Sequence, residues 1–294
     1  MERTRRILFR VLFIALILFI PLGALANDMD ISLGRLAYPC RGAQTPVPCQ
    51  NNFHKLIRDY SFAFSPKILA PAETLGYDGF YAGLEGALTP VDSGAAYMKE
   101  GTVIQGSSDA IIFIPALHIR KGLPWSIELG SSLNYMANSE LVAMGAEVKW
   151  SLFEGFRKPK LGYLPDVAVR ASVMRLLGSS DIDLTIVGLD ASISRPFAVS
   201  GEVIFTPYLG YQFLWSFVYA ESVVVGQRQN ELLDQAVVGK DAVFQFKKET
   251  LYRHRPFVGF RFIWEHLTFT PEVSLGLGDN KVAVQPAFAL GADF

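Results

Sequence analysis

Side chains that could act as nucleophiles, general bases or metal ligands are few in this chain and widely separated. The glycines at Gly83 and Gly86 lie within a strand-like run, whereas a nucleotide-binding glycine loop needs a strand-to-helix turn. The two cysteines lack nearby histidine or acidic partners for a tetrahedral zinc site. No histidine has a second one four residues away, as a zinc-binding helix requires: His54, His118, His254 and His266. We therefore predict no catalytic residue, no metal and no cofactor.

Charged side chains form the second chemically interesting group, because they recur in segments where polar and apolar residues alternate. A period of two places successive residues on opposite faces of a strand. We expect eight of these charges to lie on the inner face of one sheet, where burial makes ion pairing necessary. The eight are Glu85, Glu128, Glu147, Lys149, Arg170, Asp190, Arg261 and Glu272.

Long alternating segments are the elements that would position these charges. Between Trp125 and Tyr135, one face reads Trp, Ile, Leu, Ser, Leu, Tyr and the other Ser, Glu, Gly, Ser, Asn. Residues 111–120 are apolar on both faces, so the pattern does not show which of the two faces points inward. The series predicts ten strands, at 78–89, 109–120, 125–135, 141–153, 166–176, 183–195, 202–217, 253–264, 267–277 and 282–294.

A secreted β-sandwich and a transmembrane β-barrel both show such alternation. Hydrophobic residues make up 50% of the 294 residues, aromatic residues 13% and charged residues only 19%. Sandwich strands usually run about 5–6 residues, whereas these are long enough to cross a bilayer at a tilt. Aromatic residues near the strand ends are typical of interfacial girdles. We predict an all-β, antiparallel up-and-down transmembrane barrel of about ten strands over residues 77–294. Twelve strands would need pairing by residues 60–75 and a split of loop 218–252.

Residues 1–26 have the three parts of a secretory signal peptide. Four arginines between residues 3 and 10 precede an apolar run at 11–22, and Ala24–Ala26 forms a small-x-small cleavage site. The alternative is a retained membrane anchor. Pro21 and Gly23 interrupt a run that is short for a membrane span, so cleavage is favoured.

Residues 27–76 are predicted to form a separate periplasmic segment. A helical spacing of apolar residues predicts a helix over 53–65, with Asn51 or Asn52 as its cap and Pro66 ending it. The residues with this spacing are Phe53, Leu56, Ile57, Tyr60 and Phe64.

Cys40 and Cys49 lie in the same segment, on either side of a proline-rich stretch. In an oxidising compartment an even pair that closes a short loop indicates a disulfide. Two free thiols are the alternative.

The last strand carries the most specific family signal. Apolar residues occupy alternate positions from Val282 to Phe294, the C-terminal residue. This pattern resembles the C-terminal signature of Gram-negative outer-membrane β-barrel proteins. The resemblance implies contact with outer-membrane lipid and recognition by the barrel-assembly machinery, with Phe288, Leu290 and Phe294 as the signal. An even strand number places both chain ends in the periplasm.

Several function classes are disfavoured by the sequence. The net charge of −1 argues against nucleic-acid binding. Ten strands is also the number in the omptin protease family, but that resemblance would need acidic and His–Asp pairs at the external rim. The candidates here, His254 with Asp241 or Asp234, lie in an irregular loop. We therefore predict that the protein is not an enzyme.

Two non-enzymatic functions remain open. Barrels of about eight strands fill their lumen with side chains, and aqueous pores appear near sixteen strands. We therefore expect a narrow or plugged channel for small solutes. The alternative is a structural or surface-interaction barrel that displays external loops 90–108 and 218–252.

The eight inward charges are expected to form a salt-bridge layer in the periplasmic half of the lumen. Five are acidic and three are basic, so Lys55 or Arg58 of the predicted helix could supply the missing positive charge. The helix at 53–65 would then lie beneath or within this layer. The layer would either gate a solute path or simply fill the barrel.

Changing Phe294 to Asp tests the C-terminal signal. We expect a lower yield of folded, heat-modifiable barrel in the outer membrane, because the assembly machinery would no longer recognise the last strand. Gel-shift assays on outer-membrane fractions measure this yield. Normal assembly of the variant would contradict the assignment of Phe294 as the signal.

Overall fold

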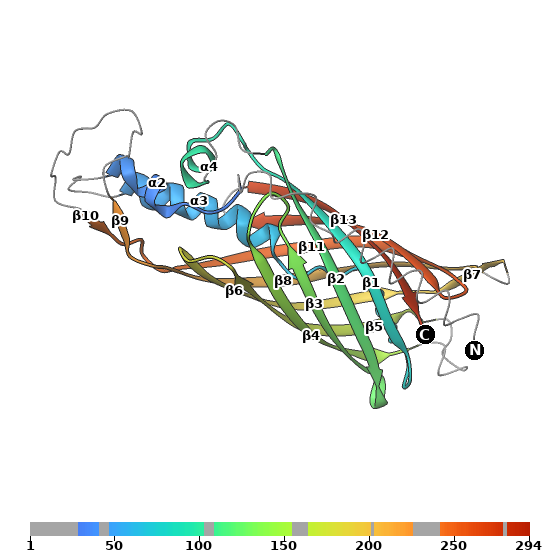
Figure 1. Ribbon diagram of the computed structural model, residues 1–294. Coiled ribbons are helices and arrows are strands. Elements are labelled where there is room, and N and C mark those ends of the chain that lie inside the picture. The colour runs from blue at the N-terminus through green and yellow to red at the C-terminus, as the bar shows by residue number, and fades with distance from the viewer. Residues whose placement is uncertain are drawn as a thin grey trace.

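Ten long antiparallel strands form one closed sheet in the computed structural model, which describes residues 29–40, 47–102, 109–154, 164–200, 203–225, 242–278 and 281–294 (Figure 1). Consecutive long strands pair with one another, and β13 pairs with β1 to close the barrel. The predicted ten-stranded barrel is confirmed. Its strands are β1 (Phe80–Pro90), β2 (Ile111–Leu123), β3 (Ile127–Tyr135), β4 (Val142–Phe153), β5 (Asp166–Leu177), β6 (Ile182–Ser194), β8 (Val203–Ala220), β11 (Glu249–Trp264), β12 (Leu267–Gly278) and β13 (Lys281–Asp293).

Three short strands lie outside this count. β7 (Phe197–Ser200) pairs only with β8, while β9 (Val223–Val225) and β10 (Ala242–Phe244) form a separate two-stranded sheet. Residues 60–75 contribute no strand. The alternative of twelve barrel strands is therefore wrong for the part of the chain that is described.

The connections define two rims of the barrel. The C-terminal rim carries Phe80 and Phe294, whose backbones exchange hydrogen bonds of 2.8 Å, and the tight turn at 265–266. The loop rim carries the long connections at 91–110 and 221–248 (Figure 1). The proposed signal peptide at 1–26 and much of loops 90–108 and 218–252 lie outside the described residues.

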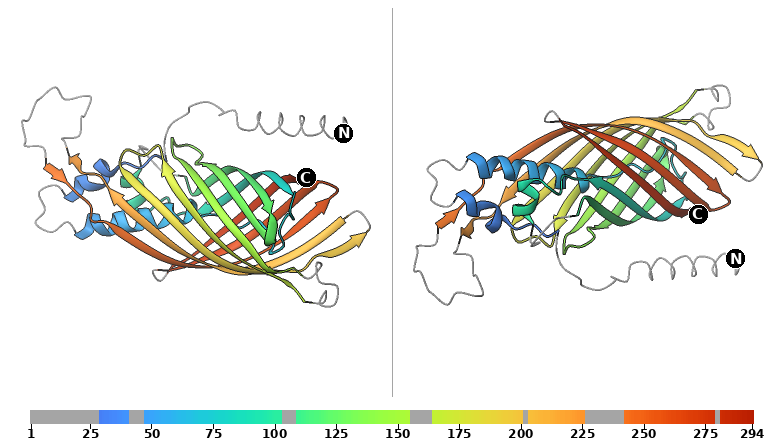
Figure 2. Two further views of the ribbon diagram at one scale, coloured as in Figure 1. Left: turned by 90° about the horizontal axis from the view of Figure 1, so that it is seen from below. Right: turned by 90° about the horizontal axis from the view of Figure 1, so that it is seen from above.

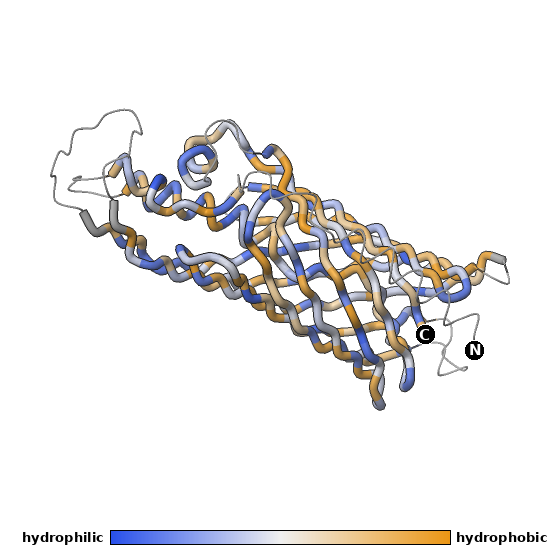
Figure 3. Tube along the Cα trace, viewed as in Figure 1, coloured by the Kyte–Doolittle hydropathy of each residue, from blue (hydrophilic) through white to orange (hydrophobic). Residues whose placement is uncertain are grey.

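Alternation along the strands gives the wall two different faces. Outward side chains such as Met144 and Trp150 are each more than half exposed, whereas the residues next to them in sequence are buried. Figure 3 shows hydrophobic and hydrophilic residues alternating along the strands of the barrel. An apolar outer wall is what a lipid-facing barrel requires.

Helix α3 (Val47–Ala63) lies inside the loop-rim half of the barrel (Figure 2). Phe53, Leu56, Ile57 and Tyr60 are fully buried, and they pack in one apolar cluster with inward residues of the strands. The helix starts at Val47, before the predicted cap at Asn51 or Asn52, since Pro48 is tolerated in a first helical turn.

Short helices surround α3 at the loop rim. They are α2 (Leu33–Ala37), the 3₁₀ turn η1 (Tyr38–Cys40) and α4 (Ala96–Gly101), and a further 3₁₀ turn, η2 (Pro124–Ser126), precedes β3. The predicted disulfide between Cys40 and Cys49 is confirmed and joins η1 to the start of α3. We call the described residues 29–40 and 47–79 the plug, and residues 65–79 its lumen segment.

The predicted placement of residues 27–76 at the same end as the C-terminus is wrong. The backbone N–H of Met29 donates to the carbonyl of Asn138 at the loop rim, whereas Phe80 and Phe294 lie at the opposite rim. The plug therefore runs the length of the lumen. The physical reason is that an isolated helix with this apolar face would expose it to water, whereas the loop-rim half of the lumen buries it.

Single cysteines at three exposed positions test this path in a background lacking Cys40 and Cys49. Asn51→Cys on α3 and Ala96→Cys on α4 should react with a membrane-impermeant reagent from the same side of the membrane. Asp78→Cys should react only from the other side, because it precedes β1 at the C-terminal rim. Labelling of Asn51→Cys together with Asp78→Cys, and not with Ala96→Cys, would contradict the path.

Candidate functional site

The lumen segment is an irregular stretch of backbone enclosed by the barrel. From Ser65 to Ala72 every residue is buried, and the segment belongs to no helix or strand. Buried backbone N–H and C=O groups need hydrogen-bond partners, and here neither a helix nor a sheet supplies them. The side chains of the lumen supply them instead.

Carboxylates of the barrel wall accept hydrogen bonds from the N–H groups of the segment. Glu272 accepts from the N–H of Leu69 at 2.9 Å. Glu128, near the C-terminal rim, accepts from the N–H of Leu75 at 3.1 Å. Glu154, just after β4, and the hydroxyl of Ser194 on β6 accept from the N–H groups of Thr74 and Ala72 at 3.0 Å each, so acceptors reach the segment from several parts of the wall.

Cationic side chains donate to the carbonyl groups of the same segment. Arg170 reaches the carbonyls of Lys67 and Ile68 at 3.1 and 3.2 Å. Lys149 donates to the carbonyls of Pro71 and Glu73 at 3.3 and 2.9 Å. Arg255, which is fully buried, donates to the carbonyl of Pro66 at 2.8 Å. The barrel thus provides cations for the carbonyls and carboxylates for the N–H groups.

The same charges also pair with one another in a chain that crosses several strands. His118 Nδ1 lies 2.6 Å from Glu85, and its Nε2 lies 3.4 Å from Glu147. Arg170 then bridges Glu147 and Asp190, at 2.9 Å to each. All five side chains are almost completely buried, and pairing offsets part of the cost of burying each charge.

Strand β3 contributes small residues where this chain crosses it. A Cβ atom on Gly130 would lie 2.7 Å from Cγ of Glu147, too close for any real side chain. The glycine therefore leaves room for Glu147 of β4 to reach His118 of β2 across the intervening strand. Position 130 requires glycine for this close approach and not for backbone conformation.

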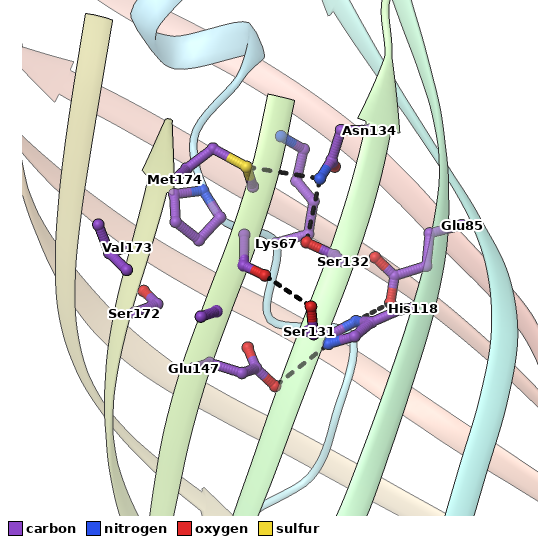
Figure 4. Close-up of a pocket in the computed structure, with 13 residues that line it drawn as sticks. Lys67, Glu85, His118, Ser131, Ser132, Asn134, Glu147, Ser172, Val173 and Met174 are labelled. Carbon is purple, nitrogen blue, oxygen red and sulfur yellow. Dashed lines mark hydrogen bonds and ion pairs between the residues drawn. The ribbon is translucent and has the colours of Figure 1, made fainter. Parts of the chain in front are cut away.

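A small polar cavity adjoins His118 (Figure 4). The side chains of Lys67, Asn134 and Ser132 surround it together with Glu85 and Glu147. The space left for a water-sized molecule is about 10 Å³, which holds about one water. His118 has a carboxylate beside each ring nitrogen, Glu85 at Nδ1 and Glu147 at Nε2.

A second group of charges lies nearer the C-terminal rim. Lys149 pairs with Glu128 at 3.0 Å, and Arg261 pairs with Asp293. The guanidinium of Arg120 lies 4.0 Å above the ring of Tyr81, a geometry that attracts a cation to an aromatic face.

The structure places all eight predicted charges inside the barrel, and six of them contact another of the eight or the plug directly. Glu85 sits midway along β1, so the charges begin at mid-height and extend toward the C-terminal rim. Glu85 and Arg261 pair with residues that were not predicted, namely His118 and Asp293.

The expected contribution of Lys55 or Arg58 to this layer is wrong. Lys55 is exposed, and Arg58 pairs with Asp59 of its own helix at 3.0 Å. Among the described residues, His118, Arg120 and Arg255 are instead additional cations of the lumen. His118 and Arg120 lie in segment 111–120, which is apolar on both faces. The alternation of residue types therefore did not show which of its side chains point inward.

Polar contacts also fix the plug at the loop rim. The hydroxyl of Tyr60 donates to the carbonyl of Met29 at 2.6 Å, and that of Tyr97 on α4 donates to Asp59 at 2.6 Å. Burial, together with the hydrogen bond to Asp59, raises the pKa of Tyr97. Phe53 stacks on Phe246 with ring centroids 4.6 Å apart.

These features define the class of protein. A closed antiparallel barrel with an apolar outer wall and a filled, charged interior is a transmembrane β-barrel of the bacterial outer-membrane type. Within the described residues, no helix is long and apolar enough to span a membrane, and no group of metal-ligating side chains is present.

Comparisons with known proteins find similarity to solved structures. No family model and no curated protein matches the chain. The N-terminal β-barrel domain of Pseudomonas aeruginosa OprF is 10% identical, with a TM-score of 0.33, over 74% of this chain and 99% of its own. The β-domain of the Bordetella autotransporter BrkA is 13% identical, with a TM-score of 0.40, over 74% and 99%. The Yersinia pestis attachment invasion locus protein Ail is 10% identical, with a TM-score of 0.29, over 74% and 99%.

Replacing Arg170 with Ala tests whether the charge network holds the plug. The change leaves Glu147 and Asp190 without their shared partner and frees two plug carbonyls, so we expect a loss of about 3–5 kcal/mol in unfolding free energy. Urea unfolding of the refolded barrel in micelles measures this loss.

Arg175→Ala is the matched control on the same strand, since Arg175 pairs with Asp183 at 2.7 Å but both side chains are about half exposed. That variant should lose less than about 1 kcal/mol. Equal losses in the two variants would show that the lumen network does not stabilise the fold.

Proposed function

We propose that this protein is a closed outer-membrane barrel whose loop rim, with the plug built into it, is an interaction surface at the cell exterior. The observation that carries this proposal is the way the plug fills the lumen at two levels. Apolar packing around α3 closes the loop-rim half, and hydrogen bonds to the lumen segment close the other half.

The charges of the lumen have a structural use in this proposal. Each of Arg170, Lys149 and Glu272 binds a backbone group of the plug, so the layer does not need a passing solute to explain it. The longer connections gather at the loop rim, which is the usual external end of such barrels. In this orientation Met29 also lies at the exterior, with Phe294 in the periplasm.

A gated channel for small solutes is the second candidate. It is favoured by one observation, namely that the lumen segment is held by side-chain contacts without any strand pairing. Withdrawal of the lumen segment would leave a lumen lined by charges of both signs. This candidate requires that the plug leave the lumen under some condition.

We further propose that the protein is not an enzyme. Both nitrogens of His118 face carboxylates, and Nδ1 of His254 lies 2.5 Å from the hydroxyl of Tyr211. Asp234 and Asp241, the possible acidic partners of His254, lie outside the described residues. The proposed partners are outer-membrane lipid, the assembly machinery during biogenesis and an external ligand at the loop rim.

Single-channel recording distinguishes the two candidates. A closed barrel predicts no discrete conductance steps from the full chain in planar bilayers. Steps should appear when Phe53 and Ile57 are both changed to Asp, because charges on the buried face of α3 expel the helix from the apolar half of the lumen and draw out the lumen segment that directly follows it.

The control variant places Asp at Asn51 and Lys55, on the exposed face of the same helix. It should remain as silent as the unchanged protein. Steps from the unchanged protein that a small solute blocks would favour the channel and contradict the closed barrel.

A further inference from the structure

A groove crosses the lipid-facing wall of the barrel. Its volume is about 640 Å³, and apolar side chains from β3, β4, β5, β6 and β8 line it. The strand register shows how it forms. Trp150, Val169, Ala191 and Tyr211 are consecutive cross-strand partners, and they make one row across the wall.

The neighbouring row has the same composition. Val148, Ala171, Leu189 and Phe213 are also consecutive partners on β4, β5, β6 and β8. Each row has one alanine in its middle, and three of the four end residues are aromatic: Trp150 on β4, and Tyr211 and Phe213 on β8. The alanines lie beside larger side chains, which makes a trough with Ala171 and Ala191 at its base, Tyr211 and Phe213 at its β8 end, and Trp150 at its β4 end.

A polar pair lies at one end of this trough. The row of Phe213 continues to His254 on β11, and His254 Nδ1 lies 2.5 Å from the hydroxyl of Tyr211. His254 also meets the ring of Phe213 edge-on, with centroids 4.8 Å apart. Both members of the pair are exposed on the outer wall. With the Tyr211 hydroxyl donating to Nδ1, the Nε2–H of His254 is left as a donor on the lipid side.

The height of this pair matches a membrane interface. His254 pairs with Leu277, next to the last residue of β12 at the loop rim. Trp264, an outward aromatic at the C-terminal rim, lies ten residues further along β11. Ten residues at about 3.3 Å each, tilted by about 40°, span about 25 Å, which is the height of the apolar band of such barrels. His254 therefore lies at the level of lipid headgroups, while the trough descends from it into the apolar layer.

We propose that this groove binds one acyl chain of a phospholipid, whose phosphate accepts a hydrogen bond from His254. The wall already faces lipid, so the occupant is a molecule that surrounds the barrel. The apolar trough matches the chain, and the Tyr211–His254 pair matches the polar head above it. Each part of the site thus corresponds to one part of the ligand.

Fluorescence quenching tests the site with the full chain refolded in detergent. Trp150 is kept as the reporter by changing the other three tryptophans, Trp125, Trp215 and Trp264, to Phe. Phosphatidylglycerol with brominated acyl chains is then titrated into the micelles. We expect saturable quenching of Trp150 with one lipid per barrel. A protein that keeps only Trp264 should show unsaturable quenching, since it is remote from the groove.

Filling the groove should remove this binding. Ala171→Leu together with Ala191→Leu should abolish saturable quenching, whereas Ala82→Leu, an outward alanine on β1, should leave it unchanged. Heat-modifiable mobility on gels confirms that each variant is folded. His254→Leu should weaken binding about tenfold, the effect expected from losing one hydrogen bond.

Three results would overturn the proposal. Unsaturable quenching of Trp150 would show that lipids contact the wall without a specific site. Equal binding of a brominated diacylglycerol, which lacks phosphate, would remove the role of His254. Displacement by lipid A, but not by unbrominated phosphatidylglycerol, would show that the occupant is not a phospholipid.

Discussion

The hydrogen bonds between charged side chains of the barrel and the backbone of the lumen segment are the interaction on which the rest of the structure depends. An irregular chain inside a lumen has neither helix nor sheet to satisfy its polar groups, so the wall must do so. A single side chain can satisfy several of these groups. The guanidinium of Arg170 binds two plug carbonyls and two carboxylates. The buried positions of Arg170, Lys149 and Glu272 follow from that requirement.

The lumen is divided into two layers with different chemistry. Around α3, inward residues such as Ile112, Leu184 and Leu214 are apolar and bury the helix as a protein core would. Toward the C-terminal rim the inward residues become charged, because the plug there is extended backbone and not a helix. The change in the wall therefore tracks the change in the conformation of the plug.

Much of this architecture could be predicted from the sequence, since a period of two determines both the strands and the side of the wall on which each charge lies. Eight of the inward charges were identified in this way. His118 and Arg120 were not, because the alternation fails along β2, where Ile112 and Ile114 face the plug and their neighbours face lipid. The position of the plug could not be predicted from local sequence patterns either, because its contacts join residues more than 100 positions apart, such as Leu69 and Glu272.

The opposite locations of Met29 and Phe294 restrict the order of events during biogenesis. Between Met29 and Phe80 the described chain passes through a closed ring of strands from the loop rim to the C-terminal rim. If the seam between β1 and β13 closed first, the bulky helix and its disulfide loop would have to travel past Glu147, Arg170 and their neighbours along the whole axis. Closing the seam last lets the ten strands wrap around a helix already in place. The strands then close around the plug, which already occupies the lumen when β13 pairs with β1.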